Sequence, residues 1–339
     1  MACVISAVLR SLSVALTLVL GFALPVNARR SNGNERIHLV PRYQAGQVLR
    51  YNIQLRTETT SNATGPILDP EGATEFKQSV GVVLRLEVLS VAGTEAGPVS
   101  LRATYEKVAV SSKSNSYDPD AAALEQQYQK LEGRSMEFTL LPDGEIADVK
   151  GLAEVATDPS RAIEVNQWLS QLTLGAAAPR KGIAIGEKWS SEHAVDNAPI
   201  AGVEWHMESI YQNNEPCTVS GSAASTNSET VPPSAPARTS GECAIILTRS
   251  ETRNSNGGQD RTPAAYKENG LRTSGEWKGT GETLTAISLR TGMVVSVTQT
   301  GTTQMDFTVT AAASGGHIRY SGEVHSQSQI TLLSQTKIP

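Results

Sequence analysis

The stretch "SVGVVLRLEVLSV", residues 79–91, decides the fold class of this chain. Its apolar residues recur at every second position, with Arg85 and Glu87 between them. A period of two places alternate side chains on opposite faces of a β-strand, which predicts one covered and one solvated face. The covered face would consist of Val80, Val82, Leu84, Leu86 and Val88.

The same alternation continues along much of the chain. In residues 99–111, "VSLRATYEKVAVS", apolar and charged positions again separate onto two faces. Further strand-like segments run from residue 186 onward, and we expect separate strands at 270–281, 282–289, 292–301 and 304–312. Aromatic residues are only 5% of the chain. The sequence predicts an α+β fold that is mainly antiparallel β, with an aliphatic core.

Two amphipathic helices are expected near the middle of the chain, over 118–133 and 158–175. Each begins with Asp-Pro, the residues preferred at an N-cap and the first helical position, and each ends at glycine. The predicted core-facing residues are Ala121, Leu124, Tyr128 and Leu131 in the first helix, and Ala162, Val165, Leu169 and Leu172 in the second. The polar stretch 254–270 is expected to be a surface loop.

A strand-turn-strand pattern occurs twice, as "EFTLLPDGEIADVKG" (137–151) and "AISLRTGMVVSVTQTG" (286–301). Its turn glycines are Gly144 and Gly292, and each half of the chain opens on a similar turn, with Gly46 in one half and Gly186 and Trp189 in the other. These turns predict two related halves, 43–178 and 179–335, built as curved sheets or half-barrels. Coincidence between two strand-rich segments is the alternative.

The first 28 residues have the layout of a secretory signal peptide. One positive charge precedes an apolar run, and small residues stand at the expected cleavage site. An uncleaved anchor is the alternative, although the run is shorter than the roughly 20 residues a spanning helix needs. We expect cleavage, a mobile leader over 29–42, and a periplasmic or extracellular protein without a later transmembrane segment.

The charge balance argues against nucleic acid as a partner. Loss of Arg10 with the signal peptide leaves 28 Lys and Arg against 34 Asp and Glu, a net charge of −6. Nucleic-acid binding usually requires a basic footprint.

Cys217 and Cys243 are the two cysteines that remain after cleavage, and they flank a polar insert. We predict a disulfide that closes the loop 217–243, since exported proteins fold in an oxidising compartment. Two free thiols are the alternative, and two cysteines alone do not make a metal site.

No catalytic motif is recognisable, so we predict no catalytic, metal-binding or cofactor-binding residues and a non-enzymatic protein. His206 and Glu208 share one strand face, and so do His317, Arg319, Glu323 and His325. Both rows are typical of exposed strand faces, but a hydrolase would gain support if they converged in a pocket.

The turn at Gly186–Trp189, the hairpin "FTLLPDGEIADV" and the ending "GMVVSVTQTGTTQMDFTV" together resemble a family of uncharacterised secreted bacterial proteins. The resemblance implies a β-rich two-part body and transfers no functional residue. A more distant likeness, in architecture only, is to periplasmic lipoprotein carriers, in which a curved sheet wraps helices and an apolar ligand.

Three functions therefore stay open. An apolar or lipid-like ligand, or an envelope component, could bind the face formed by Val80 to Val88; the alternative for that face is a fully packed core. The second function is an envelope scaffold that contacts another protein through its polar loops. The third is a hydrolase with an unfamiliar site.

Overall fold

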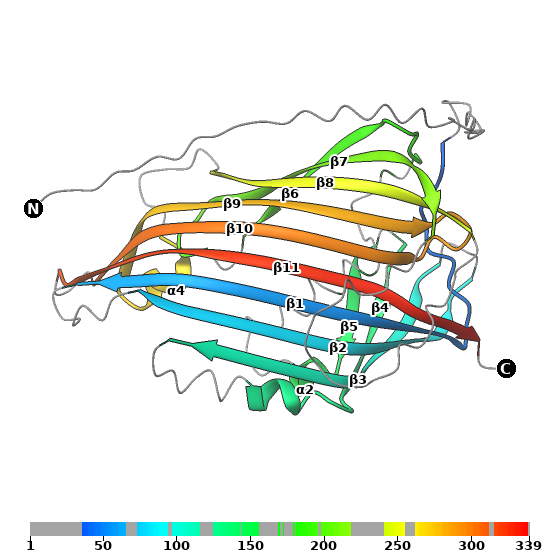
Figure 1. The fold of residues 1–339 in the computed structure, drawn as a ribbon, viewed down its shortest axis with the longest axis horizontal. Coiled ribbons are helices and arrows are strands. Elements are labelled where there is room, and N and C mark those ends of the chain that lie inside the picture. The colour runs from blue at the N-terminus through cyan, green and yellow to red at the C-terminus, as the bar shows by residue number, and fades with distance from the viewer. Residues whose placement is uncertain are drawn as a thin grey trace, which may run out of the picture. The chain divides into compact units, whose positions relative to one another are not determined.

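In a computed structural model of the chain, Arg36–Pro339 form one compact unit built around a single 11-stranded antiparallel sheet. The strand order is β5-β4-β3-β2-β1-β11-β10-β9-β8-β7-β6, so β5 and β6 lie at the two edges (Figure 1). The structure describes residues 36–65, 73–93, 97–115, 125–142, 144–155, 169, 172, 179, 181–195, 198–217, 241–254, 262–311 and 315–337. The predicted signal peptide lies outside these residues.

The strands are long, and the named helices are short. The strands are β1 (Gln47–Thr64), β2 (Thr74–Val91), β3 (Val99–Ser114), β4 (Ser135–Leu140), β5 (Ile146–Lys150), β6 (Lys188–Ala194), β7 (Val203–Pro216), β8 (Glu242–Asn254), β9 (Leu271–Ser288), β10 (Val294–Ala311) and β11 (His317–Lys337). The helices are α2 (Leu152–Val155) and α4 (Ala264–Glu268). A further helical segment covers residues 125–129.

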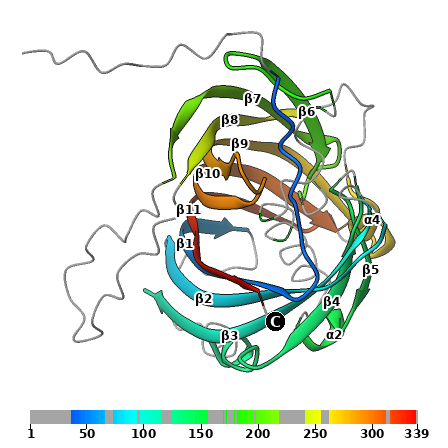
Figure 2. The ribbon, with the colours of Figure 1, turned by 90° about the vertical axis from the view of Figure 1, so that its right-hand side faces the viewer.

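Figure 2 shows the sheet bent into an arc, with a concave face that we call the inner face and a convex face that we call the outer face. The pairing register shows which face each residue occupies, because directly paired residues point to the same side of the sheet. Leu84 pairs with Tyr51 on the inner face, and Arg85 pairs with Arg50 on the outer face. The prediction of a mainly antiparallel β fold is confirmed.

The main hydrophobic core lies on the inner face of β1 to β4 and continues onto β10 and β11. It includes Leu131, Leu169 and Leu172 from the two predicted helices, all buried. Of the helix expected over 118–133, residues 125–129 are helical, and Gly133 has the positive φ of a helix end. Residues 118–124, and 158–175 apart from Leu169 and Leu172, lie outside the described residues.

Two sequence expectations about segment lengths are wrong. The segments 270–281 and 282–289 form one strand, β9, and 292–301 and 304–312 contribute to one strand, β10. Backbone pairing with neighbours on both sides continues through Gly281 and Gly301, where two of the expected segments ended. The expected loop 254–270 contains the short helix α4.

Both predicted hairpins are present, β4–β5 and β9–β10. Gly46, Gly144, Gly186 and Gly292 all have positive φ, between 66° and 85°, which non-glycine residues rarely adopt. At Gly292 a Cβ atom would also lie 2.1 Å from the carbonyl oxygen of Val40. Glycine is therefore required there by two independent constraints.

The expected two halves are not two sheets, because β1 pairs with β11 and joins them into one. The halves still form two consecutive blocks of the sheet, β1–β5 and β6–β11. Each repeated hairpin joins the fourth and fifth strand of its block, counted from β1 or from β6. This position agrees with a duplicated unit, which stays a prediction.

Residues 36–43 cross the concave side of the sheet and connect the β6 side with β1, as the dark blue segment in Figure 2 shows. We call this segment the strap. Ile37 forms two 2.9 Å backbone hydrogen bonds with Ile183, Leu39 is buried, and the Arg42 N–H donates to Thr291 at 2.8 Å. Residues 36–42, expected to belong to a mobile leader, are instead held to the sheet by these bonds.

Arg36 anchors the start of the strap through Glu187. Their side chains lie 3.1 Å apart, and Arg36 also donates to the carbonyl of Gly182 at 2.8 Å. The pKa of Glu187 is lowered, first by the hydrogen bond that its carboxylate accepts from the Ala184 N–H and then by Arg36.

This contact predicts a pH dependence that Glu187→Gln would remove. A carboxyl whose folded-state pKa is depressed contributes stability above its unfolded pKa and loses it as the pH falls through the folded value. We therefore expect wild type to exceed Glu187→Gln in thermal midpoint by a constant margin above about pH 5.5 that shrinks below about pH 4.5. A margin that grows on acidification would contradict the assignment.

The free edge of β3 is covered in an unusual way. Beyond β4, Tyr105 exchanges backbone hydrogen bonds with residues 133 and 134. Further along the edge, the Val108 and Ser112 N–H groups donate to the carboxylates of Glu132 and Glu125. Glu125 lies at the start of the helical segment 125–129 and Glu132 in the turn that follows it, and their contacts show that both carboxylates face β3. These carboxylates occupy the place of a further strand and protect the edge from pairing with another chain.

Candidate functional site

The predicted ligand face is part of the main core. Val80, Val82, Leu84, Leu86 and Val88 all lie on the inner face of β2 and are at most 7% exposed. They are buried in one cluster with apolar side chains of β1, β3 and β4. Packing against neighbouring side chains accounts for their burial, which is the alternative that the sequence left open.

The inner face changes character beyond this core, along the strands toward α4. The second cross-strand row beyond the core consists mainly of small side chains, and we call it the small-residue row. Its members, followed through the pairing register from β6 to β3, are Ser191, Met207, Ser250, Gly281, Gly301, Ser326, Thr57, Gln78 and Ser112. Because most side chains of this row are small, little side-chain volume covers the backbone of the inner face here.

Large apolar side chains return beyond the small-residue row, in a region that we call the aromatic end. It comprises Phe76, Trp205, Trp277, Met305, Phe307, Tyr320 and Val324. All are partly exposed, in contrast to the sealed core. Sequence alternation thus places apolar residues on the inner face at both ends of the strands, but only one end is fully packed.

Glycines hold the aromatic rings close to the sheet. A Cβ atom on Gly279 would lie 2.5 Å from the Cη2 atom of Trp205, so the indole covers the position where a side chain would stand. Phe307 and Tyr320, paired across β10 and β11, stack with ring centroids 5.2 Å apart. Trp277 packs with Ile200 and Val203 in a small separate cluster.

Several buried polar atoms near the small-residue row have no hydrogen-bond partner among the described residues. Gln78 Nε2 and Ser112 Oγ belong to the row itself, and Trp189 Nε1 and Ser328 Oγ belong to the adjacent row toward the core. Buried polar groups usually have a partner, so such groups call for an explanation. Water or a ligand with hydrogen-bonding groups would satisfy them.

The outer face carries a shallow depression over β7 to β11, with a volume of about 690 Å³. Two cross-strand rows of polar side chains form its sides, and the backbone around Gly281 and Gly301 lies between the rows. His206, Glu208 and His325, which the sequence singled out, all line it together with Arg249, Arg253, Glu251 and Glu282. His317 and Arg319 do not line it; Arg319 forms a two-pronged contact with Asp306, which lowers the pKa of that carboxyl.

The ionisable side chains that line the depression form hydrogen bonds or ion pairs with neighbouring side chains on the same face. Glu208 accepts from Lys188 at 2.9 Å, which lowers the pKa of the glutamate, and Arg253 lies 2.6 Å from Glu251. His206 lies 3.2 Å from Glu192, and Arg249 contacts Glu282. His325 contacts Thr302 and lies 3.4 Å from Glu323, which does not itself line the depression. Among the described residues, no three His, Cys, Asp or Glu side chains group as a metal site.

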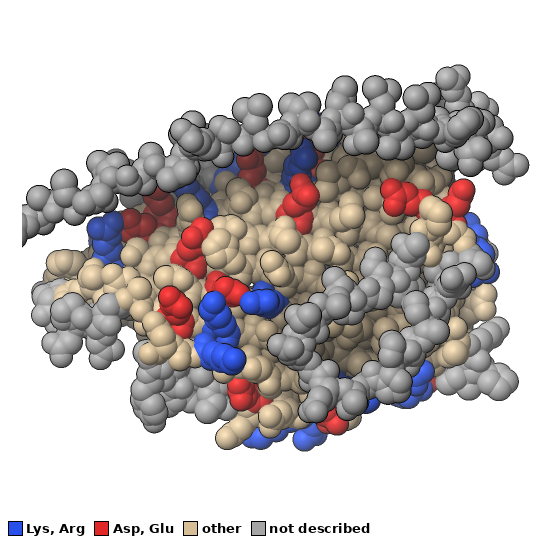
Figure 3. All heavy atoms as spheres, viewed as in Figure 1, with Lys and Arg blue, Asp and Glu red and all other residues tan. Residues whose placement is uncertain are grey.

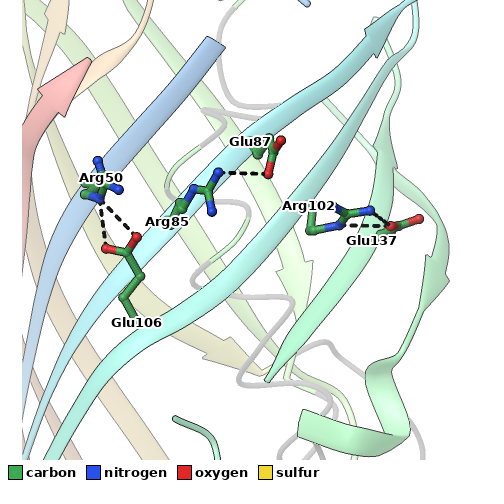
Figure 4. Close-up of polar contacts among 6 residues, drawn as sticks. All are labelled: Arg50, Arg85, Glu87, Arg102, Glu106 and Glu137. Carbon is green, nitrogen blue, oxygen red and sulfur yellow. Dashed lines mark hydrogen bonds and ion pairs between the residues drawn. The ribbon is translucent and has the colours of Figure 1, made fainter. Parts of the chain in front are cut away.

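The outer face of β1 to β4 has a comparable network, which Figure 4 shows. Arg50 reaches across β2 to Glu106 at 2.8 Å, Arg85 lies 3.2 Å from Glu87, and Arg102 lies 2.6 Å from Glu137. The contact with Glu137 raises the pKa of Arg102. In the part of the outer face that Figure 3 shows in colour, acidic and basic groups are interspersed. Such partly exposed pairs stabilise a fold only modestly.

Cys217 and Cys243 form a disulfide at the base of the β7–β8 connection, with the sulfurs 2.04 Å apart. The Cys217 N–H also donates to the Gly241 carbonyl at 2.9 Å. The rest of the insert, 218–240, lies outside the described residues.

Sequence reasoning missed the aromatic end and the small-residue row. The available signal was the spacing of Gly275, Gly279 and Gly281, which differ by even numbers and so share one strand face with Trp277. Glycine within a strand often marks a close approach by another group, as Trp205 makes here.

Comparison with known proteins leaves the class undefined. No family model and no curated protein match this chain, so the resemblance to uncharacterised secreted proteins stays a prediction. Among solved structures, the outer membrane protein OprG from Pseudomonas aeruginosa is similar at 7% identity over 88% of this chain and 100% of that chain, with a TM-score of 0.19. A TodX monoaromatic hydrocarbon channel mutant is similar at 8% identity over 87% and 93%, with a TM-score of 0.14. At such low scores neither likeness informs the fold or function.

Within the described part of the chain, no helix has the length and apolar character needed to cross a membrane.

Proposed function

We propose that this chain is an exported, non-enzymatic protein that holds an apolar, lipid-like molecule against the inner face of its sheet. The binding region is the aromatic end together with the small-residue row, and not the Val80–Val88 face expected from the sequence. The disulfide supports export, since such bonds persist in oxidising compartments.

The change in burial along the inner face carries this proposal. Toward the strap, inner-face residues such as Tyr51 and Ile330 are at most 1% exposed, whereas Trp205, Met305 and Val324 on the same face are partly exposed. Apolar side chains that remain accessible on a concave surface, with hydrogen-bonding groups beside them, are typical of ligand sites. The outer depression gives weaker support for a catalytic function, because its carboxylates and basic side chains form hydrogen bonds or ion pairs with different partners and do not converge on one point.

Mass spectrometry of organic extracts from gently purified protein tests the proposal, together with binding of an uncharged fluorescent apolar probe. Ser326→Leu fills the small-residue row from the middle of β11 and should weaken probe binding about tenfold. Gln329→Leu adds a similar side chain to the outer face of the same strand and should leave binding unchanged. Absence of both extracted lipid and probe binding would overturn the proposal.

A further inference from the structure

The outer face carries nearly all the charged side chains of the long strands, and the part of the inner face beyond the core carries no Asp, Glu, Lys or Arg at its described positions. At the described inner-face positions of the small-residue row and the aromatic end, the register places no Asp, Glu, Lys or Arg; inner-face Glu242 lies at the opposite end of β8. The charged side chains in this part of the strands alternate onto the outer face, where Arg249 meets the carboxylate of Glu282. Arg50 and Arg85 meet carboxylates on the outer face of the first block. Carboxylate, ammonium and guanidinium groups are therefore absent from the described strand positions that would hold the ligand, where His193 beside Trp205 is an ionisable side chain.

Hydrogen-bonding groups without charge are abundant on that surface. The small-residue row supplies hydroxyls from three strands through Thr57, Ser250 and Ser326, and the unpartnered atoms of Gln78 and Ser112 lie in the same row. These groups can bind a hydroxyl, ester or amide. An ionised head group placed there would lose hydration without gaining a counter-charge, which is unfavourable in a partly desolvated site.

On the basis of the proposed function, we infer that the ligand is an uncharged amphiphile. Its apolar chain lies along the aromatic end, and its neutral polar head meets the small-residue row. Residues 281 and 277 on β9, one in each region, are separated by about 13 Å at the usual strand rise, which gives head and chain distinct surfaces. The inference excludes fatty-acid anions and anionic phospholipids as preferred ligands.

Three probes with the same alkyl chain test the head-group preference: monolauroylglycerol, laurate and dodecyltrimethylammonium. Displacement of an uncharged fluorescent probe is measured at pH 8, below the micelle concentration of each compound. We expect monolauroylglycerol to bind at least about tenfold more tightly than either charged compound. Equal or tighter binding of a charged compound would overturn the inference but leave the proposed function intact. Displacement by none of the three would likewise overturn the inference, whereas the proposed function fails only if the fluorescent probe itself does not bind and no lipid is extracted.

A charge-gain variant gives an independent result. Ser326→Lys places an ammonium in the small-residue row at an exposed position, and it should improve laurate binding about tenfold relative to monolauroylglycerol. Gln329→Lys, on the outer face of the same strand, should leave the ratio unchanged. An unchanged ratio in Ser326→Lys, with a wild-type thermal midpoint, would contradict the placement of the head group. If that variant unfolds, Ser250→Lys on β8 makes the same test.

Discussion

Replacement of Leu84 by alanine should lower the free energy of unfolding by about 2–5 kcal/mol, the usual range for a buried leucine. Leu84 has no exposed surface and lies on β2 in the middle of the main core cluster. Its neighbours belong to strands paired on both sides, which leaves little freedom for them to close the cavity. The large effect follows if the Val80–Val88 face is packed core and not an open ligand surface.

Leu284→Ala is the matched control, because the same side chain is removed from an exposed position. Leu284 lies on the outer face of β9 and is 45% exposed, so its loss should change the unfolding free energy by less than about 0.5 kcal/mol. Urea unfolding of the two variants and wild type, followed by far-UV circular dichroism, measures both effects. A small effect at Leu84 would mean that its surroundings relax or are partly empty.

Local alternation was sufficient to predict the two faces of the sheet. Leu101 and Leu84 fall on the inner face and Arg102 and Arg85 on the outer face, as the two-residue period requires. The alternation depends only on neighbours within a strand, so it can be read without knowledge of which strands pair.

The candidate site could not be predicted in the same way, because it depends on register. Thr57, Gln78, Gly301 and Ser326 come from four strands and share a row only through their pairing. A shift of one residue in any strand would move its member to the outer face. Whether an inner-face residue is packed or accessible depends in turn on what lies over it, as the contrast between Tyr51 and Trp205 shows.

The two long strands β9 and β10 show why strand ends were also misplaced. Glycines in "SGEWKGTGE", residues 274–282, favour a break by propensity alone. β9 instead pairs with β10 throughout this stretch and with β8 from Thr280 onward, and Trp205 covers Gly279. Tertiary contacts outweigh a local preference of this size.

Loss of the disulfide should be the other large effect on stability. The Cys217→Ser/Cys243→Ser variant opens a loop with a sequence separation of 26, and a closed loop of this length restricts the unfolded chain by roughly 3–4 kcal/mol. The native sheet should change little, because Cys217 N–H still bonds to Gly241 and β7 still pairs with β8. We therefore expect a lower urea midpoint with an unchanged far-UV spectrum, since the effect resides mainly in the unfolded state.

Reduction and alkylation of the wild-type protein distinguish the effect of losing the disulfide from the effect of replacing the cysteine side chains. Intact mass with alkylation should show no modified cysteine without reductant and two after reduction, and the reduced, alkylated protein should match the double variant in stability. Two alkylated thiols in the native protein without reductant would contradict the disulfide. A loss below about 1 kcal/mol in both forms would instead mean that the unfolded chain is already restricted in this region, because the entropic argument requires a flexible loop to open.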